Sequence, residues 1–230
     1  MNNFFAGSLY IGVTISFLAY SIGKVINNKF KNPIFNPLLI SIALVILFLH
    51  FTGVSYENYN LSAKYLSYLL GPATVALAVP LYQQMEILKK HYKAIGIALL
   101  IGVISSLISV SLFSILFKLE KEIVITLLPK SVTTAIGMDI AEELGGFGSI
   151  TAAVIIITGV FGYMTAETVF KIFKIKHPIS KGLAMGASSH VLGTAKAVEL
   201  GELEGAMSSL AIVICGILTI LGANLIVQFL

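Results

Sequence analysis

The sequence predicts an all-α polytopic membrane protein, and its composition and apolar runs support that prediction. Hydrophobic residues make up 57% of the 230 residues, charged residues only 11%, and the mean hydropathy is +0.95. An average soluble domain has roughly 25% charged residues. Several apolar runs approach the roughly 20 residues that a helix needs to cross the hydrocarbon core, where it satisfies its own backbone. We expect about 7–8 membrane segments in a single membrane domain over residues 1–230.

The charge pattern indicates topology. A net charge of +4 suggests nucleic acid in a soluble protein, but here the lysines gather between apolar runs, where the positive-inside rule places them. We therefore expect the chain to interact with the lipid bilayer and not with nucleic acid. The N-terminal run lacks a positive region and a clear cleavage site, and Lys24, Lys29 and Lys31 follow it. It is predicted to stay as a first helix of a multi-pass plasma-membrane protein, with its N-terminus outside.

Apolar runs and their interruptions predict the elements in order. The runs cover residues about 4–26, 38–54, 61–81, 94–117, 149–173, 182–198 and 206–230. Basic connections are expected at 89–93 and 171–181. The third run contains Gly71, Pro72 and Pro80, and prolines remove helical hydrogen bonds, so this run should be kinked or broken.

The stretch Leu127–Gly146, LLPKSVTTAIGMDIAEELGG, carries polar residues where a membrane chain is otherwise apolar. Pro129 is predicted to open a helix, because the first turn leaves N–H groups unpaired anyway. Such a helix start offers free N–H groups and a positive dipole end, which suit an anion. A segment that enters the membrane and returns would also place the basic connection 171–181 inside, so a re-entrant or broken element reconciles the charges.

Lys130 is the main candidate for binding an anion. A lysine at the mouth of a membrane element often only anchors at the interface. The alternative is that its ammonium, with the hydroxyls of Thr133 and Thr134 within one turn, neutralises a small carboxylate.

Three acidic residues share the helix face that follows. Asp139, Glu142 and Glu143 have the spacing i, i+3 and i+4. They form either a solvated edge or, for Asp139 or Glu142, a membrane-embedded group that couples transport to a proton or a cation.

Polar residues recur in the last third, in the run GASSHVLGTAKAVE. His190, Thr194 and Ala197 are expected on one helical face. His190 is either a satisfied packing residue or a group that donates to substrate or relays a proton. Lys196 and Glu199, at i and i+3, are expected to pair.

A shift of 57 residues relates parts of the chain, since 129 − 72 = 57 and 186 − 129 = 57. It aligns the hydroxyls of Thr74, Ser131 and Ser188. The repeat-like units cover about 14–70, 71–127, 128–184 and 185–230. Interrupted helices in corresponding positions are typical of a transporter's binding site near the bilayer midplane, so we expect carboxylate between helix starts at Pro129 and Gly186. The candidate binding residues are Thr74, Lys130, Ser131, Thr133, Thr134, Ser188, Ser189, His190 and Thr194.

The motifs PKSVTTAIGMDIAEELGG and ASSHVLGTAKAVELGELEGAMSSLA resemble the LrgB/CidB family of bacterial membrane proteins, and GPATVALAVPLYQQ is similar to that family's earlier motif. The resemblance covers nearly the whole chain. The membrane half of the plastid glycolate/glycerate translocator belongs to the same family. The family pattern has Pro at the position of Ala135 and Glu near Asp139, and this chain departs from it at both.

This resemblance implies two alternative functions. One is transport of small monocarboxylates such as glycolate, glycerate or pyruvate. The other is antiholin-like regulation of murein hydrolase activity and autolysis, with a separate LrgA/CidA-type membrane partner. We also expect a homo-oligomer.

We expect that the chain is not an enzyme and that it has no cofactor and no metal site. An intramembrane hydrolase built on Ser188 or Ser189, His190 and Asp139 is disfavoured, because adjacent residues of a regular helix point in different directions.

Overall fold

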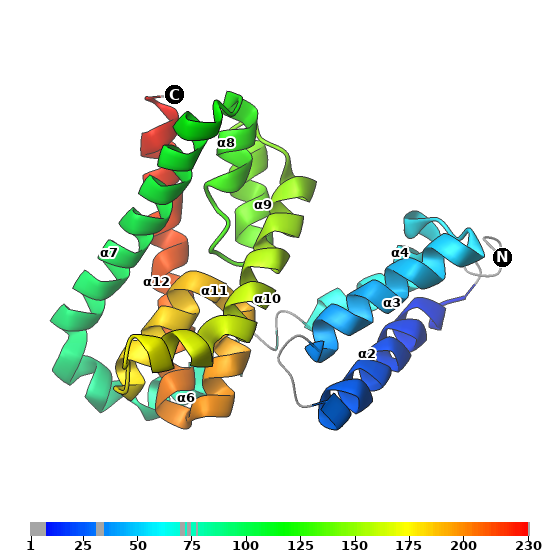
Figure 1. Ribbon diagram of the computed structural model, residues 1–230, viewed down its shortest axis with the longest axis horizontal. Coiled ribbons are helices and arrows are strands. Elements are labelled where there is room, and N and C mark those ends of the chain that lie inside the picture. The colour runs from blue at the N-terminus through cyan, green and yellow to red at the C-terminus, as the bar shows by residue number, and fades with distance from the viewer. Residues whose placement is uncertain (1–7, 31–34, 70–71, 73–74, 77, 230) are drawn as a thin grey trace. The chain divides into compact units, whose positions relative to one another are not determined.

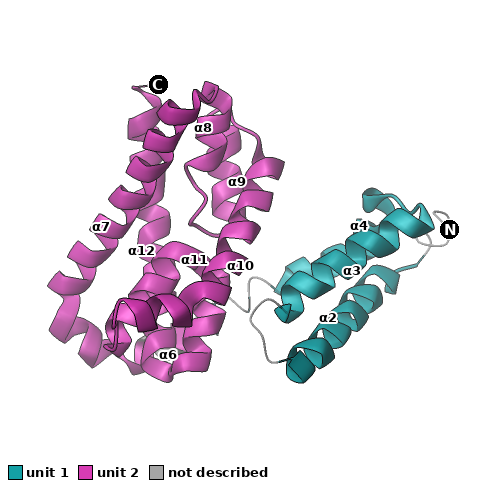
Figure 2. Ribbon diagram, in the orientation of Figure 1, with its two compact units in different colours: residues 1–76 teal, residues 77–230 magenta. Residues whose placement is uncertain are grey.

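The computed structural model describes residues 8–30, 35–69, 72, 75–76 and 78–229. The described chain is built from helices (Figure 1). It forms two compact units, residues 1–76 and 77–230, which Figure 2 shows in separate colours. The single membrane domain stays a prediction of the sequence, and each unit is described by itself.

The described residues of the first unit form two apolar helices and a shorter helical segment. They are α2 (Ile11–Phe30), α3 (Pro37–Thr52), α4 (Tyr56–Ala63) and the 3-10 helix η2 (Lys64–Leu69). Asn36 caps α3 because its side chain accepts hydrogen bonds from the N–H groups of Leu38 and Leu39. Where α2 meets α4, the buried hydroxyl of Ser62 accepts the N–H of Gly12 at 2.8 Å.

The second unit contains the long helices. Its elements are α6 (Ala78–Gln83), α7 (Met85–Phe117), α8 (Lys121–Leu127), α9 (Thr134–Glu143), α10 (Gly148–Ile172), α11 (Pro178–Leu200) and α12 (Glu202–Val227). Of the described helices, α7, α10 and α12 are long and apolar enough to cross a membrane. These three helices bear out the predicted helical membrane class. The predicted third run, 61–81, is interrupted, since α4 ends at Ala63, the 3-10 helix η2 covers Lys64–Leu69 and α6 begins at Ala78.

One predicted connection is wrong. The basic residues 89–93 do not form a loop but the second and third turns of α7. No proline or glycine separates them from the apolar run, and lysine is a good helix former, so the helix continues through them. At 33 residues α7 is about 50 Å long, which exceeds the hydrocarbon core of roughly 30 Å and leaves room for a charged end.

The stretch Leu127–Gly146 is broken into α8 and α9 by a turn over residues 128–133. Pro129 does not open a helix, contrary to the prediction. It follows Leu128, the C-cap of α8, and ends that helix because it has no N–H to continue the hydrogen bonds. The next helix begins at Thr134, with Thr133 in the N-cap position.

After α9 the chain returns to α8. The N–H of Phe147 donates to the Thr126 hydroxyl at 2.9 Å, and the Thr151 hydroxyl donates to the Thr126 carbonyl at 2.9 Å. Gly146 also lies against Thr126, where an added Cβ would come within 2.9 Å of its hydroxyl oxygen. The two short helices therefore form a hairpin, the α8–α9 hairpin, whose tip is residues 128–133.

α11 also reverses its direction. His190 has φ 44° and ψ −129°, which interrupts the helix. Contacts with α12 advance along both helices before His190 and run backward after it: Gly182 with Glu204, Gly186 with Ser208, then Thr194 with Ser208 and Val198 with Gly205. The first half of α11 is therefore parallel to α12 and the second half antiparallel. We call this pair of halves the α11 hairpin, with its tip at His190.

Gly186 lies inside the first half of the α11 hairpin, so the predicted helix start there is wrong. A Cβ at Gly186 would meet the carbonyl oxygen of Ser208. Small residues let membrane helices pack backbone against backbone, and this packing, not a helix start, is what the glycine serves.

The core of the second unit lies between α7 and α12. On α7, Ile95, Leu99, Val103 and Leu107 recur every four residues and are buried in one cluster with Cys215 of α12. Other apolar side chains of α7 are exposed, as suits a helix that faces lipid. Figure 1 shows α7 and α12 ending at the same end of the unit, while α10 runs the opposite way.

Candidate binding cavity

A cavity of about 870 Å³ lies where the tips of the two hairpins meet the middle of α7 and the second half of α10. Its polar lining consists of Ser105, Ser106 and Ser109 of α7, Lys130 and Ser131 of the α8–α9 tip, Thr158 and Thr165 of α10, and Ser180, Ser188 and Ser189 of α11. The remaining lining is apolar or glycine. A mostly apolar cavity with a few convergent polar groups is the usual form of a small-molecule site.

Lys130 is the only charged residue among the described residues that line this cavity. Its ammonium donates to the Ser131 hydroxyl at 3.1 Å, and Ser131 lies 3.4 Å from the hydroxyl of Ser106 on α7. Ser131 is buried. One ammonium beside hydroxyl donors, with no carboxylate in the described lining, favours a single anionic group over a cation.

Four predicted binding residues come together here from distant parts of the chain. Lys130 and Ser131 come from one tip, and Ser188 and Ser189 from the other. The hydroxyl oxygens of Ser188 and Ser189 are 3.0 Å apart. Ser189 packs so closely on α10 that a Cβ at Gly162 would collide with its hydroxyl.

The other predicted binding residues that the structure describes do not line the cavity. Thr133 and Thr134 start α9. His190 is buried, with its Nε2 2.9 Å from the carbonyl oxygen of Ile155, and the Thr194 hydroxyl donates to the His190 carbonyl at 3.1 Å. Thr74 lies outside the described residues.

The predicted face of His190, Thr194 and Ala197 is not a face of one regular helix. The break at His190 sets this residue apart from the helical half that carries the other two. His190 links the α11 tip to α10 through Ile155, and Ile155 in turn packs where a Cβ on Gly137 of α9 would lie. The His190 side chain therefore connects the α11 tip to α10, and it does not line the cavity.

Asp139, Glu142 and Glu143 are exposed on α9 and lie outside the cavity lining. Glu142 packs against Gly148 at the start of α10. Among the described residues, these carboxylates therefore do not share a cavity with Lys130. Their coupling role stays a prediction.

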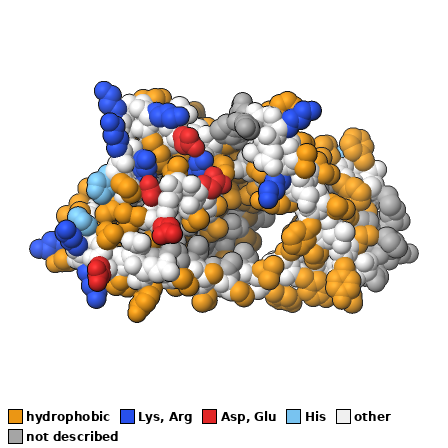
Figure 3. All heavy atoms as spheres, turned by 90° about the horizontal axis from the view of Figure 1, so that it is seen from below, with side chains coloured by type: hydrophobic (Ala, Val, Ile, Leu, Met, Phe, Trp, Pro, Cys, Tyr) orange, Lys and Arg blue, Asp and Glu red, His pale blue; other side chains and the backbone are white. Residues whose placement is uncertain are grey.

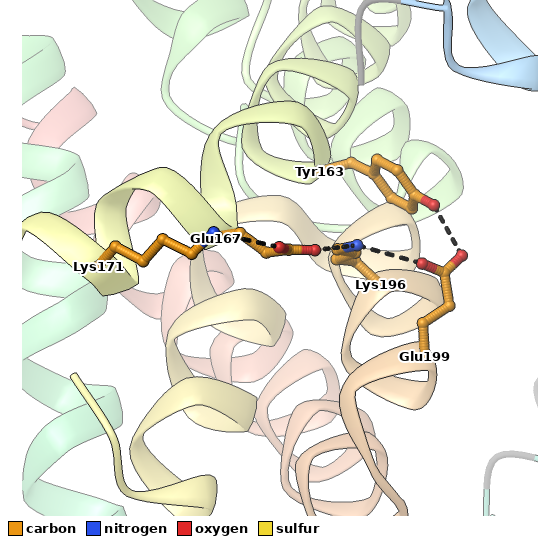
Figure 4. Close-up of polar contacts among 5 residues, drawn as sticks. All are labelled: Tyr163, Glu167, Lys171, Lys196 and Glu199. Atoms are coloured by element: carbon orange, nitrogen blue, oxygen red, sulfur yellow. Dashed lines mark hydrogen bonds and ion pairs between the residues drawn. The ribbon is translucent and has the colours of Figure 1, made fainter. Parts of the chain in front are cut away.

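Lys196 belongs to a separate cluster that joins α10 to α11 (Figure 4). Its ammonium lies 3.3 Å from Glu199, which confirms the predicted pair, and 2.7 Å from Glu167 of α10. The Tyr163 hydroxyl donates to Glu199 at 2.7 Å, and Lys171 lies 4.0 Å from Glu167. The spacing in the sequence predicts the contact between Lys196 and Glu199 within α11. The contact between Lys196 and Glu167 of α10 depends on the tertiary fold.

Sequence reasoning missed the hydroxyls that α7 and α10 contribute. Ser105, Ser106 and Ser109 lie within about one turn of α7, and Thr158 and Thr165 are seven residues apart on α10. Such side chains mostly bond back to their own helix, as Ser109 does to the carbonyl of Ser106 at 2.7 Å. The available signal was their clustering in otherwise apolar runs.

The backbone at His190 leads to a stability prediction. A residue with a Cβ in the left-handed region costs about 1–2 kcal/mol, whereas glycine is free of that cost. His190→Ala and His190→Gly both lose the contact with Ile155, but only glycine relieves the backbone. We expect the alanine variant to unfold at the lower temperature in a thermal unfolding assay, the reverse of helix propensity. A more stable alanine variant would contradict the chain reversal.

Comparison with known proteins supports the family resemblance that the sequence motifs indicate. The LrgB-like family model matches residues 16–229. Antiholin-like proteins LrgB from Bacillus cereus (strain B4264) and Bacillus anthracis (strain A0248) are each 37% identical to this chain over 221 residues, which cover 96% of it and 96% of each relative. No solved structure matches the chain. With both the family model and these relatives extending over nearly its whole length, the chain belongs to the LrgB-like family.

Proposed function

We propose that this chain transports small monocarboxylates, of the glycolate, glycerate and pyruvate class, and that the cavity between the hairpin tips is its binding site. The observation that carries the proposal is the lone ammonium of Lys130 in a cavity whose other polar groups are hydroxyls. The substrate carboxylate accepts hydrogen bonds from the Lys130 ammonium and the Ser131 hydroxyl. The hydroxyls of Ser188 and Ser189 bind the hydroxyl or keto oxygen on the adjacent carbon of the substrate.

An internal repeat supports a transporter. Under a shift of 57 residues the start of α8 falls on the start of α11 (121 + 57 = 178), and the end of α9 falls on the end of α11 (143 + 57 = 200). Thr133, at the break before α9, falls on His190 (133 + 57 = 190). Each unit then consists of a broken hairpin followed by a long apolar helix, α10 or α12.

The directions of the helices support an inverted repeat. Because α10 and α12 run in opposite directions, the two hairpins enter the unit from opposite ends and meet at the cavity (Figure 1). Interrupted elements that meet near the midplane from two inverted units are typical of secondary transporters, in which movement of the units exposes the site alternately to each side.

Charge supports an orientation in the plasma membrane. The basic turns at 89–93 begin α7, and the basic connection 171–181 follows α10, so both lie at the same end of the second unit. The positive-inside rule places this end in the cytoplasm. The α8–α9 hairpin then enters from outside and the α11 hairpin from inside.

Counterflow in proteoliposomes tests the proposal. Vesicles loaded with unlabelled glycolate, glycerate or pyruvate should accumulate labelled glycolate transiently, and protein-free vesicles should not. Ser131→Ala should slow uptake, because it removes the hydroxyl between Lys130 and α7. Ser111→Ala is the matched control, since Ser111 bonds within α7 to Leu107 and does not line the cavity. Folded protein without counterflow for any of the three, with and without proton or sodium gradients, would contradict transport.

The printed name of the relatives, antiholin-like protein, favours a second candidate, regulation of cell lysis. The family resemblance implies that an LrgA/CidA-type partner would take part in this regulation. The two candidates separate in one experiment. Lys130→Gln should abolish counterflow, so an autolysis phenotype in cells that depends on carboxylate transport should change with it. A phenotype that survives this substitution but requires the partner would favour regulation.

A further inference from the structure

A second cavity, of about 490 Å³, lies where α10 ends and α11 begins. It shares only Phe170 with the cavity between the hairpin tips. Figure 3 shows the face seen from below, where lysine and acidic side chains gather among apolar ones. The proposed transport function does not use this cavity.

Four lysines line the second cavity: Lys171, Lys174, Lys176 and Lys181. Glu167 is the one acidic residue of the described lining, so the formal charge there is +3 (4 − 1). Glu167 is already engaged by Lys196 at 2.7 Å, whereas Lys171 approaches it only to 4.0 Å with a side chain that is 81% exposed. Four like charges around one hollow create a positive potential that attracts an anion.

The backbone holds one of these lysines at the cavity. At the end of α10 the N–H of Ile175 donates to the carbonyl oxygen of Phe170 at 2.9 Å. The N–H of Lys174 donates to the carbonyl oxygen of Lys171 at 3.3 Å. This pattern places Lys174 in the left-handed position, with φ 52°, where glycine is the usual residue. The position therefore carries an ammonium where glycine would avoid the unfavourable backbone conformation.

The surroundings place the cavity at a boundary between hydrocarbon and water. Ile172 and Phe173 beside it are 67% and 71% exposed, at the end of a helix long and apolar enough to cross a membrane. Phe170, Ile175 and Leu200 contribute an apolar wall. Basic pockets between helices at the cytoplasmic surface are suited to anionic lipid headgroups.

We propose that this cavity binds a phosphate group, supplied by the headgroup of an anionic phospholipid or by soluble phosphate. Lys174, Lys176 and Lys181 neutralise the phosphate oxygens as point charges. With a lipid bound, its acyl chains lie along the exposed Ile172 and Phe173. Occupancy ties the end of α10 to the start of the α11 hairpin.

Thermal unfolding of the purified full-length chain in neutral detergent tests the proposal. The probes are phosphatidylglycerol, phosphatidylcholine, sodium phosphate and sodium chloride, with the two salts at equal ionic strength. Phosphatidylglycerol, sodium phosphate or both should raise the midpoint by several degrees more than phosphatidylcholine and chloride do. Phosphatidylglycerol alone assigns the site to a lipid, whereas an equal effect of inorganic phosphate assigns it to the free anion.

The variants Lys174→Asn and Lys181→Gln, alone and combined, should reduce this shift, and the double variant should lose it. Asparagine tolerates the left-handed conformation, so Lys174→Asn removes the charge and keeps the backbone. Lys118→Asn is the matched control, because Lys118 has φ 51° at the end of α7 and does not line the cavity. The midpoint without probe shows whether each variant folds.

Native mass spectrometry of bound phosphatidylglycerol gives a second readout. The double variant should retain fewer lipids than Lys118→Asn does. Equal shifts with chloride and phosphatidylcholine, or an equal loss in the Lys118→Asn control, would overturn the proposal, because general charge screening then explains the effect.

Discussion

Lys130→Gln should weaken carboxylate binding by about 10- to 150-fold. Hydrogen bonds to charged groups contribute about 1.5–3 kcal/mol, and each 1.4 kcal/mol corresponds to a factor of ten in affinity. The effect should be large because Lys130 is the only cation in the described lining of the cavity, so no neighbouring side chain there can replace it. The dissociation constant for glycolate, measured by titration calorimetry or by ligand-dependent thermal shift, checks this expectation.

Two further variants separate charge from structure. Lys130→Arg keeps the charge and should retain part of the affinity, although its planar fork does not copy the ammonium geometry. Lys121→Gln removes an exposed lysine at the start of α8, outside the cavity, and should bind glycolate as the unmodified protein does. Equal affinity in Lys130→Gln and Lys121→Gln would remove Lys130 from the site.

Gly193→Ala should destabilise the protein by about 1–3 kcal/mol, the typical cost of overpacking. A Cβ at Gly193 would run into the carbonyl oxygen of Met185 and come within 2.8 Å of the Cβ of Ser189. The first of these atoms is backbone, so the two halves of the α11 hairpin must move apart. For a protein of this size each kcal/mol lowers the midpoint of thermal unfolding by about 2–4 °C.

Gly96→Ala provides the matched control in α7. An added Cβ there has no neighbour within 4 Å, and alanine is the better helix former by about 0.8–1 kcal/mol, so this variant should be at least as stable as the unmodified protein. Gly193→Ala should also lower glycolate affinity, because Ser188 and Ser189 lie at the displaced tip. Equal midpoints for the two variants would show that the halves of α11 do not pack as described.

Local chemistry predicts four of the residues that line the candidate cavity. Pro129 indicates the interruption between α8 and α9, and Lys130 and Ser131 lie beside it. Ser188 and Ser189 belong to a polar run in an otherwise apolar segment, but the predicted helix start at Gly186 is not where α11 is interrupted. Hydropathy and backbone preference are enough to find such polar residues and helix interruptions, because both properties act over a few residues. Pro129 itself was misassigned, because a proline can follow the end of one helix as readily as it begins the next.

What the sequence by itself determined is the helical membrane class and, to within a few residues, the apolar runs that form α10 and α12. These properties follow from composition and local propensity. The tertiary structure alone decided that α11 folds back at His190, that serines of α7 line the cavity, and that Lys196 binds Glu167. Each of these depends on which faces pack together across long sequence separations, and the packing energy that selects them is absent from any local pattern.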